Sequence, residues 1–268
     1  MRAECRAPLI WRTEIYEELE STSDTCLARA EAGEAEGLAV LALRQTKGRG
    51  SRGRSWEDPG GNLALSVILR PDGRYPSFAG FWPFLLSLAF RDGILACLSD
   101  LSAGTRLRLK WPNDVLLDGC KLGGMLIERG GVPGREWLVA GFGANLVRVP
   151  QIDGRDLACL AQVAADRVFP PAEVAIHILD AVSRYLALAE AEGFGPVRAA
   201  WLDAALPVGT RLVARGGNTY IEGEFTGIGP DGALILRTAE GLRSIATAEI
   251  LLADGADRAG AGEAVGTS

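Results

Sequence analysis

Hydrophobic positions along the chain follow two periods, which predict an α/β region followed by a β-rich region. Apolar residues at helical spacing predict helices over residues 25–34, 84–98, 171–192 and 195–205. Short β-prone apolar runs predict buried strands over residues 37–43, 62–69 and 136–143. The first part of the chain therefore alternates strands with helices around one core.

The pattern changes after Pro207. Short β-prone runs at residues 210–214, 219–227, 233–237 and 242–246 are separated by glycine-containing turns. This spacing is typical of a small β-barrel of about 45 residues. We expect domains over residues 1–205 and 207–253. The Gly/Ala-rich segment 254–268 has almost no large apolar residue and is expected to be a disordered tail.

Asp118-Gly119 lies between two apolar runs and predicts a hairpin with a two-residue type I′ turn. The register that follows pairs Leu117 with Cys120, Leu116 with Lys121, Val115 with Leu122 and Asp114 with Gly123. Because side chains alternate, Asp114, Leu116, Lys121 and Gly123 are expected on one face.

Lys121 stands in an otherwise apolar strand, where an unpaired ammonium group is costly to bury. In the predicted register it lies diagonally from Asp114, at a Cα separation of ~7–8 Å that its side chain can cross. Gly123 and Gly124 would leave room for a ligand beside this pair. A strand-edge lysine that reaches solvent is the alternative interpretation.

A basic, glycine-rich loop follows the first predicted strand. From Arg44 to Arg54 the chain has five basic residues, three glycines and no acid, although its formal net charge is -6. Glycine lets the backbone approach a ligand closely, and arginine supplies forked donors that match phosphate or carboxylate oxygens. The loop is predicted to bind an anion, although a solvated flexible loop stays open on this pattern alone.

Composition narrows the classes of function. Apolar residues make up 48% and charged residues 23% of 268 residues, which is typical of a globular soluble protein. The negative net charge argues against general binding to nucleic acid or anionic membranes. His177 is the only histidine and lies on the polar face of a predicted helix. This argues against a Ser-His-Asp or Cys-His nucleophile and excludes a histidine-built metal site.

Two further segments have open interpretations. Ser21-Thr22-Ser23-Asp24 precedes the first predicted helix, and capping its N-terminus requires only one of these side chains. The others are available to a ligand. Asn145 follows a strand that ends in Gly141-Phe142-Gly143, and it fits either a ligand contact or a turn. Five scattered cysteines and an N-terminus without a secretory pattern indicate a cytoplasmic protein.

Taken together and in this order, five segments resemble the motifs of biotin protein ligases. They are Gln45-Thr46, Gly48 to Arg54, Lys110-Trp111-Pro112-Asn113-Asp114, Lys121-Leu122-Gly123-Gly124-Met125 and Gly143-Ala144-Asn145. The resemblance implies an α+β fold, with helices packed on the mixed β-sheet of a biotin/lipoate ligase-like catalytic domain. It also implies that the C-terminal region is a small SH3-like β-barrel.

The resemblance implies a two-step ligase reaction. Biotin reacts with ATP in the presence of Mg²⁺ to give biotinyl-5'-adenylate, and a lysine of a biotin carboxyl carrier domain then takes the biotinyl group. The carrier belongs to a biotin-dependent carboxylase; no nucleic acid or membrane is expected as a partner, and a homodimer is left open. The alternatives are a ligase for lipoate or another acid, and a non-catalytic anion-binding or regulatory module.

Site residues are carried over by motif position. Lys121 and Arg49 are the expected catalytic residues. The residues expected to bind biotin are Ser21, Thr22, Ser23, Gln45, Gly48, Arg49, Gly50, Ser51, Lys121, Gly123 and Gly124. Those expected to bind ATP are Arg52, Arg54, Trp56, Lys110, Asn113, Asp114 and Asn145, with Asp114 also the candidate metal ligand.

The chain departs from the family pattern at three positions. Ser51 stands where the usual loop, Gly-Arg-Gly-Arg-Arg-Gly, has arginine, so one cation expected near the adenylate phosphate is absent. We hypothesise that the adenylate escapes faster, unless Arg52 or Arg54 compensates. Ser23 replaces the common asparagine, and its shorter side chain brings a polar group less far towards biotin. Ala144 replaces a usual isoleucine, which we interpret as a packing change.

Overall fold

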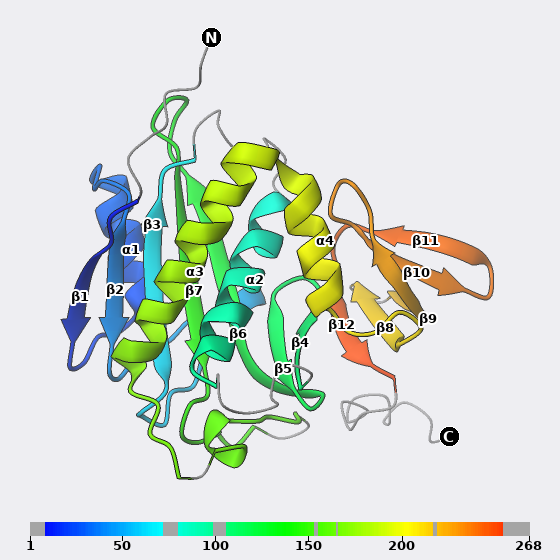
Figure 1. Ribbon diagram of the computed structural model, residues 1–268, viewed down its shortest axis with the longest axis horizontal. Coiled ribbons are helices and arrows are strands. Elements are labelled where there is room, and N and C mark those ends of the chain that lie inside the picture. The colour runs from blue at the N-terminus through cyan, green and yellow to red at the C-terminus, as the bar shows by residue number, and fades with distance from the viewer. Residues whose placement is uncertain are drawn as a thin grey trace, which may run out of the picture.

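The computed structural model describes residues 9–71, 80–98, 106–152, 155–164, 166–216 and 219–253. It contains a seven-stranded sheet and, towards the C-terminus, a separate five-stranded sheet (Figure 1). The segment predicted to be a disordered tail, residues 254–268, lies outside the described residues, as does Cys5.

The main sheet is mixed, because its first two strands are parallel and all other neighbours are antiparallel. In spatial order its strands are β1 (Arg12–Tyr16), β2 (Leu38–Ala42), β3 (Leu63–Leu69), β7 (Trp137–Ala144), β6 (Cys120–Gly130), β5 (Asp114–Leu117) and β4 (Leu107–Lys110). The central strands β2 and β3 are buried along their whole length, as their apolar runs predict.

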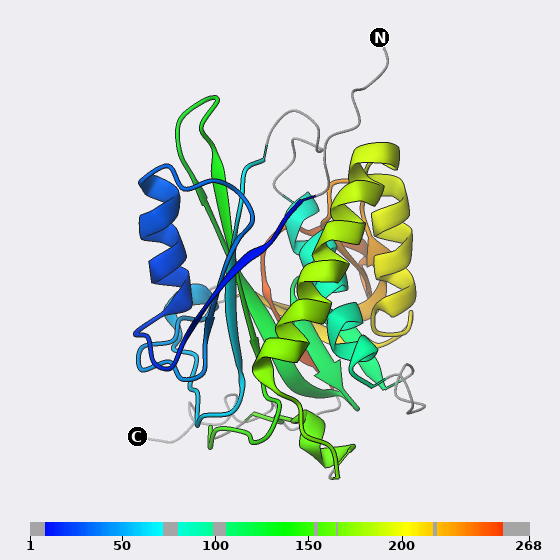
Figure 2. The same ribbon diagram turned by 60° about the vertical axis from the view of Figure 1, so that its left-hand side comes forward.

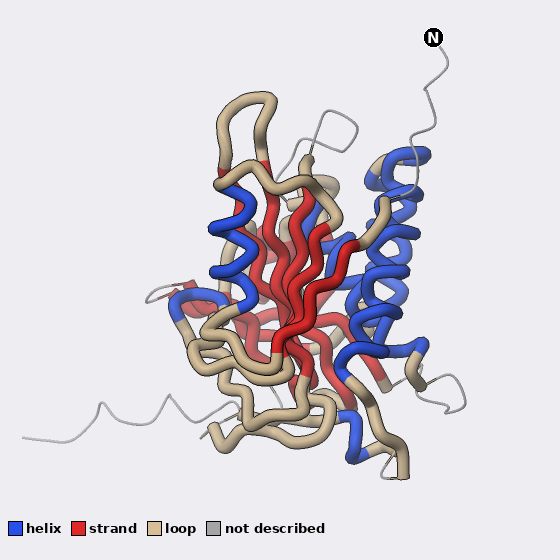
Figure 3. Tube along the Cα trace, turned by 90° about the vertical axis from the view of Figure 1, so that its left-hand side faces the viewer, coloured by secondary structure: helices blue, strands red, loops and turns tan. Residues whose placement is uncertain are grey.

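Helices cover both faces of this sheet (Figures 2 and 3). One face carries α1 (Thr22–Glu31); the other carries α2 (Phe81–Ala96), α3 (Pro171–Glu192) and α4 (Phe194–Ala204). Side chains of β3 alternate between these layers: Leu65 joins the large core under α2 and α3, and Ile68 joins the smaller core under α1. None of the described helices is long and apolar enough to cross a membrane.

The first helix begins three residues before the predicted start. Ser21 is its N-cap, and the Ser21 Oγ accepts a hydrogen bond of 3.2 Å from the Asp24 N–H. Thr22 and Ser23 therefore lie in the first helical turn and face the sheet. Three edge strands were not predicted: β1, β4 and β12 (Glu249–Leu252). Each has only four or five residues, which is too short to give a clear apolar pattern.

The predicted hairpin turn is confirmed, since Asp118 and Gly119 have φ values of 50° and 84°. The pairs Leu117–Cys120 and Leu116–Lys121 are also confirmed. The register predicted beyond them is wrong, because Leu122 is an extra residue in a β-bulge. The next pairs are Val115–Gly123 and Asp114–Gly124.

The bulge decides which glycine adjoins the lysine. A Cβ atom at position 124 would lie 3.1 Å from Lys121 Nζ, so Gly124 is on the face of the lysine. Gly123 was predicted on that face, but a Cβ atom there would lie 3.0 Å from the Phe90 ring in the core. Of the two glycines, Gly124 alone leaves space beside Lys121.

The C-terminal sheet is antiparallel and SH3-like. In spatial order its strands are β11 (Gly241–Ile245), β10 (Leu234–Thr238), β9 (Thr219–Ile228), β8 (Arg211–Gly216) and β12. The predicted SH3-like architecture is confirmed, but the sheet does not close into a barrel. In the described part of the chain β11 and β12 form its two edges, and β12 pairs on one side only, with β8.

Specific contacts attach the C-terminal sheet to the main domain. Lys110 Nζ donates to the Ile250 carbonyl at 3.0 Å, and Trp111 Nε1 donates to the Gly232 carbonyl at 3.0 Å. The basic loop joins this contact through an ion pair from Arg54 to Glu249, 2.7 Å long. The segment after β4 and the basic loop are therefore both fixed against the second sheet.

Candidate active site

Two cavities meet at Lys121. The larger, of about 870 Å³, lies between the main sheet, the basic loop and the C-terminal sheet. The smaller, of about 50 Å³, lies between the first turn of α1, the basic loop and strands β6 and β7. Lys121 lines both cavities, so a group bound in one can approach a group bound in the other beside its ammonium.

Glycines in β7 make the floor of the smaller cavity. Gly141 and Gly143 are two positions apart and face α1; a Cβ atom at position 141 would lie 2.6 Å from Ser23 Oγ. At position 143 it would lie 2.7 Å from the indole of Trp56. Close approach of these side chains therefore requires glycine at both positions, and the Gly-x-Gly spacing within a strand follows from that requirement.

Hydroxyl and amide groups form one end of the smaller cavity. Gln45 Oε1 accepts from the Thr22 N–H at 2.8 Å and from Thr22 Oγ1 at 3.1 Å. Ser66 in β3 lies behind them, with its Oγ 2.8 Å from Thr22 Oγ1 and 3.1 Å from Ser23 Oγ. The four side chains (Gln45, Thr22, Ser23 and Ser66) are neutral, so this end can recognise a ligand through the direction of its hydrogen bonds.

Arg49 spans the smaller cavity from the basic loop. Its guanidinium donates to Asp24 of α1 and to Glu128 of β6, each at 2.6 Å. The hydrogen bond to Glu128 is the main cause of a raised pKa for Arg49. Two buried polar atoms beside it, Glu128 Oε2 and Trp56 Nε1, have no hydrogen-bond partner in the described part of the chain.

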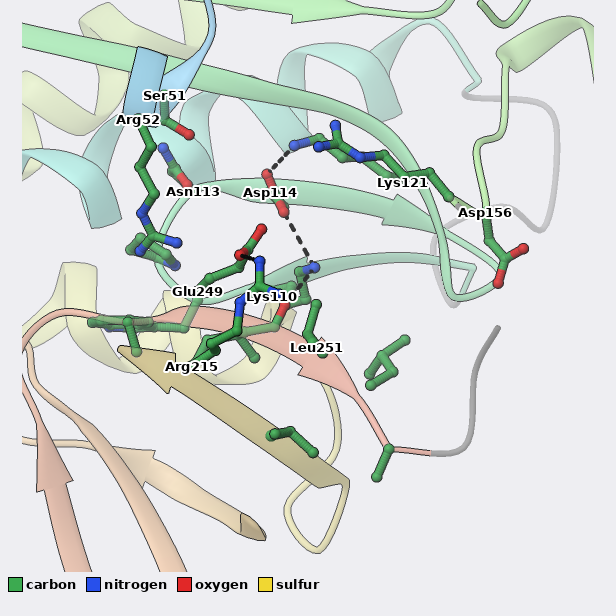
Figure 4. A pocket seen from close by; sticks show the side chains of 18 of the residues that line it. Ser51, Arg52, Lys110, Asn113, Asp114, Lys121, Asp156, Arg215, Glu249 and Leu251 are labelled. Atoms are coloured by element: carbon green, nitrogen blue, oxygen red, sulfur yellow. Dashed lines mark hydrogen bonds and ion pairs between the residues drawn. The ribbon is translucent and has the colours of Figure 1, made fainter. Parts of the chain in front are cut away.

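Asp114 holds two lysines at the wall of the larger cavity (Figure 4). Its Oδ1 lies 2.6 Å from Lys121 Nζ and its Oδ2 lies 3.3 Å from Lys110 Nζ. Burial alone would raise the pKa of the Asp114 carboxyl, but the two ammonium groups outweigh burial and lower that pKa to about 2. The Asp114 carboxylate therefore holds the Lys121 ammonium in place at the cavity wall.

The basic loop supplies further cations to the larger cavity. Ser51, Arg52 and Arg54 line it, and Arg52 adopts a left-handed backbone conformation with φ 61°. Arg54 and Arg215 of β8 both donate to Glu249. Burial would raise the pKa of Glu249, but its bonds to these arginines lower it below the usual value.

The structure groups most of the predicted site residues around the two cavities. The smaller cavity is lined by Thr22, Ser23, Gln45, Arg49, Gly50, Trp56, Lys121 and Gly124. The larger cavity is lined by Ser51, Arg52, Arg54, Lys110, Asn113, Asp114 and Lys121. Ser51, expected to bind biotin, lines the larger cavity together with the residues expected to bind ATP. Trp56, expected to bind ATP, lines the smaller cavity together with residues expected to bind biotin.

Four predicted residues lie outside the described linings of both cavities. Ser21 caps α1, as described above, and Gly123 faces the core. At Gly48 a Cβ atom would lie 2.5 Å from the Trp56 carbonyl, so glycine allows the loop to close. Asn145 is buried, and its amide donates to the Ala158 carbonyl at 3.1 Å.

The sequence reasoning missed polar residues in or behind the walls of these cavities, among them Ser66, Glu128, Arg215 and Glu249. Ser66 carried a signal, because it is the only polar residue in the buried run Leu63–Leu69. Glu128, Arg215 and Glu249 carried none, since each is defined by a partner far away in the sequence.

The candidate metal ligand does not fit a protein-held metal site. Both carboxylate oxygens of Asp114 are engaged by ammonium groups. The described residues contain no group of three or more His, Cys, Asp or Glu side chains suited to a metal ion. A divalent cation prefers several such oxygen ligands, so these side chains do not form a site for one.

Comparisons with known proteins identify the family of the chain. The model of the Biotin/lipoate A/B protein ligase family matches residues 17–141, and that of the Biotin protein ligase C terminal domain matches residues 211–252. The chain is 37% identical over 240 residues to a biotin--[acetyl-CoA-carboxylase] ligase of Paracoccus denitrificans, covering 84% of this chain and 98% of the relative. A bifunctional ligase/repressor BirA of Bacillus subtilis is 33% identical, covering 88% and 73%.

Solved structures extend the similarity to the fold. The biotin protein ligase of Aquifex aeolicus in complex with biotin and ATP has a TM-score of 0.75 at 25% identity, covering 90% of this chain and 97% of that one. The Leishmania major enzyme in complex with biotinyl-5-AMP has a TM-score of 0.63 at 27% identity, covering 88% and 98%. With both sheets and nearly the full length of a relative matched, this chain belongs to the biotin protein ligase family.

Proposed function

We propose that this protein activates biotin with ATP as biotinyl-5'-adenylate and transfers the biotinyl group to a lysine of a carrier protein. The observation that carries the proposal is the position of Lys121, which lies where a small cavity with a neutral polar end meets a large, charged cavity. The ligase names and the biotin and ATP complexes of the relatives support the same reaction.

The smaller cavity suits the bicyclic ring of biotin. Hydroxyl and amide groups form its polar end, and Leu65, Met125 and Phe142 supply apolar walls. Its volume of about 50 Å³ is smaller than the ~300 Å³ or more of typical ligand pockets. Ligand entry therefore requires its lining to move, and the basic loop that carries Arg49 is the segment we expect to shift.

In the first step, a carboxylate oxygen of biotin attacks the α-phosphorus of ATP. A carboxyl–phosphate anhydride forms, the bond to the β-phosphate oxygen breaks, and pyrophosphate leaves. Two anions must approach each other, so the protein contributes chiefly position and positive charge. Lys121 neutralises charge at the reacting junction, and Arg52 and Arg54 face the polyphosphate in the larger cavity.

Asp114 is a positioning residue in this scheme. It holds Lys121 on one side and Lys110 on the other, and Lys110 in turn reaches the C-terminal sheet. Mg²⁺ would enter as part of the substrate, with ATP, because both carboxylate oxygens of Asp114, the candidate ligand, are engaged by ammonium groups.

In the second step, the neutral amine of a carrier lysine attacks the carbonyl carbon of the anhydride. An amide bond forms, AMP leaves with the electrons of the C–O bond, and the amine loses its proton. We assign the carrier to a biotin carboxyl carrier domain of a biotin-dependent carboxylase.

Free thiols at Cys26, Cys97, Cys120 and Cys159 support a reducing compartment, the cytoplasm. A homodimer and the absence of nucleic-acid binding stay predictions.

The test is ATP–pyrophosphate exchange by the full chain with biotin or lipoate as the acid. We expect exchange with biotin and at least 100-fold less with lipoate at equal concentration. Transfer to a purified carrier domain, detected with labelled biotin, checks the second step. Exchange with lipoate alone would make the protein a lipoate ligase, and no exchange with either acid would make it a non-catalytic anion-binding module.

A further inference from the structure

We propose that Ser66 is a specificity-determining positioning residue: it accepts the proton of Ser23 because its own proton is held by Thr22, and it thereby fixes the direction of the Ser23 hydroxyl at the polar end of the smaller cavity. The cavity then presents one acceptor and one donor, and it selects a ligand edge with an N–H beside a carbonyl. The inference rests on the proposed function, since it assigns this edge to the cyclic urea of biotin.

The strand pairing places Ser66 behind the cavity. It is fully buried in β3, directly opposite Gly141 of β7. A Cβ atom at position 141 would lie 3.3 Å from Ser66 Oγ and 2.6 Å from Ser23 Oγ. Glycine therefore leaves the space in which the hydroxyl groups meet. Ser66 is absent from the cavity lining, so it acts through Thr22 and Ser23.

One backbone donor fixes the orientation of Gln45. The Thr22 N–H can only donate, and it lies 2.8 Å from Gln45 Oε1, so the amide oxygen faces it. The Thr22 hydroxyl lies 3.1 Å from the same oxygen, which can only accept. Thr22 therefore uses its single hydroxyl proton on Gln45.

The donor and acceptor of the other two hydrogen bonds follow from this use of the Thr22 proton. Ser66 Oγ lies 2.8 Å from Thr22 Oγ1, whose proton is already used, so Ser66 donates to Thr22. Ser23 Oγ lies 3.1 Å from Ser66 Oγ, whose proton is now also used, so Ser23 donates to Ser66. The protons run in one direction, from Ser23 through Ser66 and Thr22 to Gln45.

This order determines what the cavity offers. Ser23 and Gln45 both line it. Ser23 has its proton on Ser66, so it can offer the cavity only an acceptor. Gln45 has its oxygen on Thr22, so the polar group that it has left for a ligand is its amide nitrogen, a donor. A cyclic urea supplies the complementary N–H and carbonyl. The dithiolane ring of lipoate supplies neither, and would leave both groups buried and unpaired.

The direct test is Ser66→Ala in biotin-dependent ATP–pyrophosphate exchange. Without Ser66, the Ser23 proton loses its acceptor and the hydroxyl can turn a proton towards the biotin N–H. We expect the KM for biotin to rise about tenfold with kcat unchanged within about twofold. The preference for biotin over lipoate should fall by the same factor, and Ser66→Thr, which keeps the hydroxyl, should restore both.

A double-mutant cycle shows whether Ser66 acts through Ser23. Ser23→Ala alone should raise the KM for biotin. In a Ser66→Ala background it should add less than about twofold, because the acceptor it removes is already misdirected. Independent, multiplicative effects of the two substitutions would overturn the proposal.

Ser87→Ala is the matched control. Ser87 is also a fully buried serine, but it lies in α2, where it donates to the Phe84 carbonyl and accepts from Trp201. The Ser87→Ala substitution should lower the thermal stability and leave the KM for biotin unchanged. If Ser66→Ala behaves in the same way, the proposal fails while the ligase function stands. Lack of biotin-dependent exchange by the unaltered protein would instead remove the proposed function.

Discussion

The two cavities that meet at Lys121 are lined by different kinds of polar group. At its polar end the smaller one uses neutral hydroxyl and amide groups held by β3, β7 and the first turn of α1. The larger one uses cations and carboxylates from two sheets and the basic loop. Neutral hydrogen bonds select by direction, whereas charges act over distance and are screened by salt. The difference assigns selectivity to one cavity and charge neutralisation to the other.

Burial separates the two regions in the same way. Thr22, Ser23 and Ser66 are at most 6% exposed, so each unpaired polar atom there carries a full desolvation cost. The side chains of Arg54 and Arg215 in the larger cavity are 38% and 42% exposed. Their ion pairs can exchange a carboxylate for a phosphate at little cost. The smaller cavity is therefore sensitive to shape, and the larger one to charge.

Removing the shared lysine should have the largest effect on the reaction. Lys121→Ala should lower kcat for biotin-dependent exchange by about 100-fold or more, because charge at the reacting junction loses its closest cation. Steady-state exchange kinetics measure this. Lys47→Ala, which removes an exposed lysine paired with Glu20, is the control and should leave kcat unchanged. A small effect of Lys121→Ala would mean that other cations perform the neutralisation.

Asp114→Asn should destabilise the fold by about 2 kcal/mol at pH 7, because Lys121 and Lys110 lose their shared carboxylate. The folded pKa of about 2 lies below the ordinary 3.8, so the stabilisation is complete above pH 3.8 and is lost as the pH falls through 2. Urea unfolding from pH 7 to pH 2 measures it. A difference between the two proteins that persists at pH 2 would contradict the assignment.

Ser51→Arg should strengthen the larger cavity without changing the smaller one. A guanidinium at this position adds a charged donor beside Arg52 and Arg54, and we expect biotinyl-adenylate to dissociate about fivefold more slowly. Release of labelled adenylate into excess unlabelled biotin and ATP measures the rate. Ser55→Arg adds the same charge to an exposed loop position outside both linings and should have no effect. An unchanged rate in Ser51→Arg would refute the hypothesis.

The smallest effect is expected from the carboxylate that occupies two arginines of the larger cavity. Glu249→Gln should lower the KM for ATP about threefold at low ionic strength, since Arg54 and Arg215 become available to phosphate. The difference should vanish at high salt, and the KM for biotin should stay constant. Glu240→Gln, which affects an exposed pair with Arg243, is the control. A higher KM for ATP would show that Glu249 serves docking of the C-terminal sheet.

Local chemistry allowed part of the site to be predicted. Asp118-Gly119 requires positive φ at both positions, so the turn and its two adjacent pairs followed from the sequence. The attraction between Lys121 and Asp114 followed from the cost of burying an unpaired ammonium, and the structure confirms it at 2.6 Å. The bulge at Leu122 was not predictable, because residue 121 also pairs with Leu157, a distant segment.

By itself, the sequence determined most of the helices and strands, the basic loop, the hairpin with its lysine and the family, because each depends on spacing within a short segment. Only the tertiary structure decided which groups face each cavity. It put Ser51 in the wall of the larger cavity and Trp56 in that of the smaller one, and it paired Arg49 and Arg54 with carboxylates. The alignment of Ser66 with Thr22 and Ser23 was likewise decided there. Hydrogen bonds and ion pairs between distant residues depend on how strands and helices pack, which no local pattern encodes.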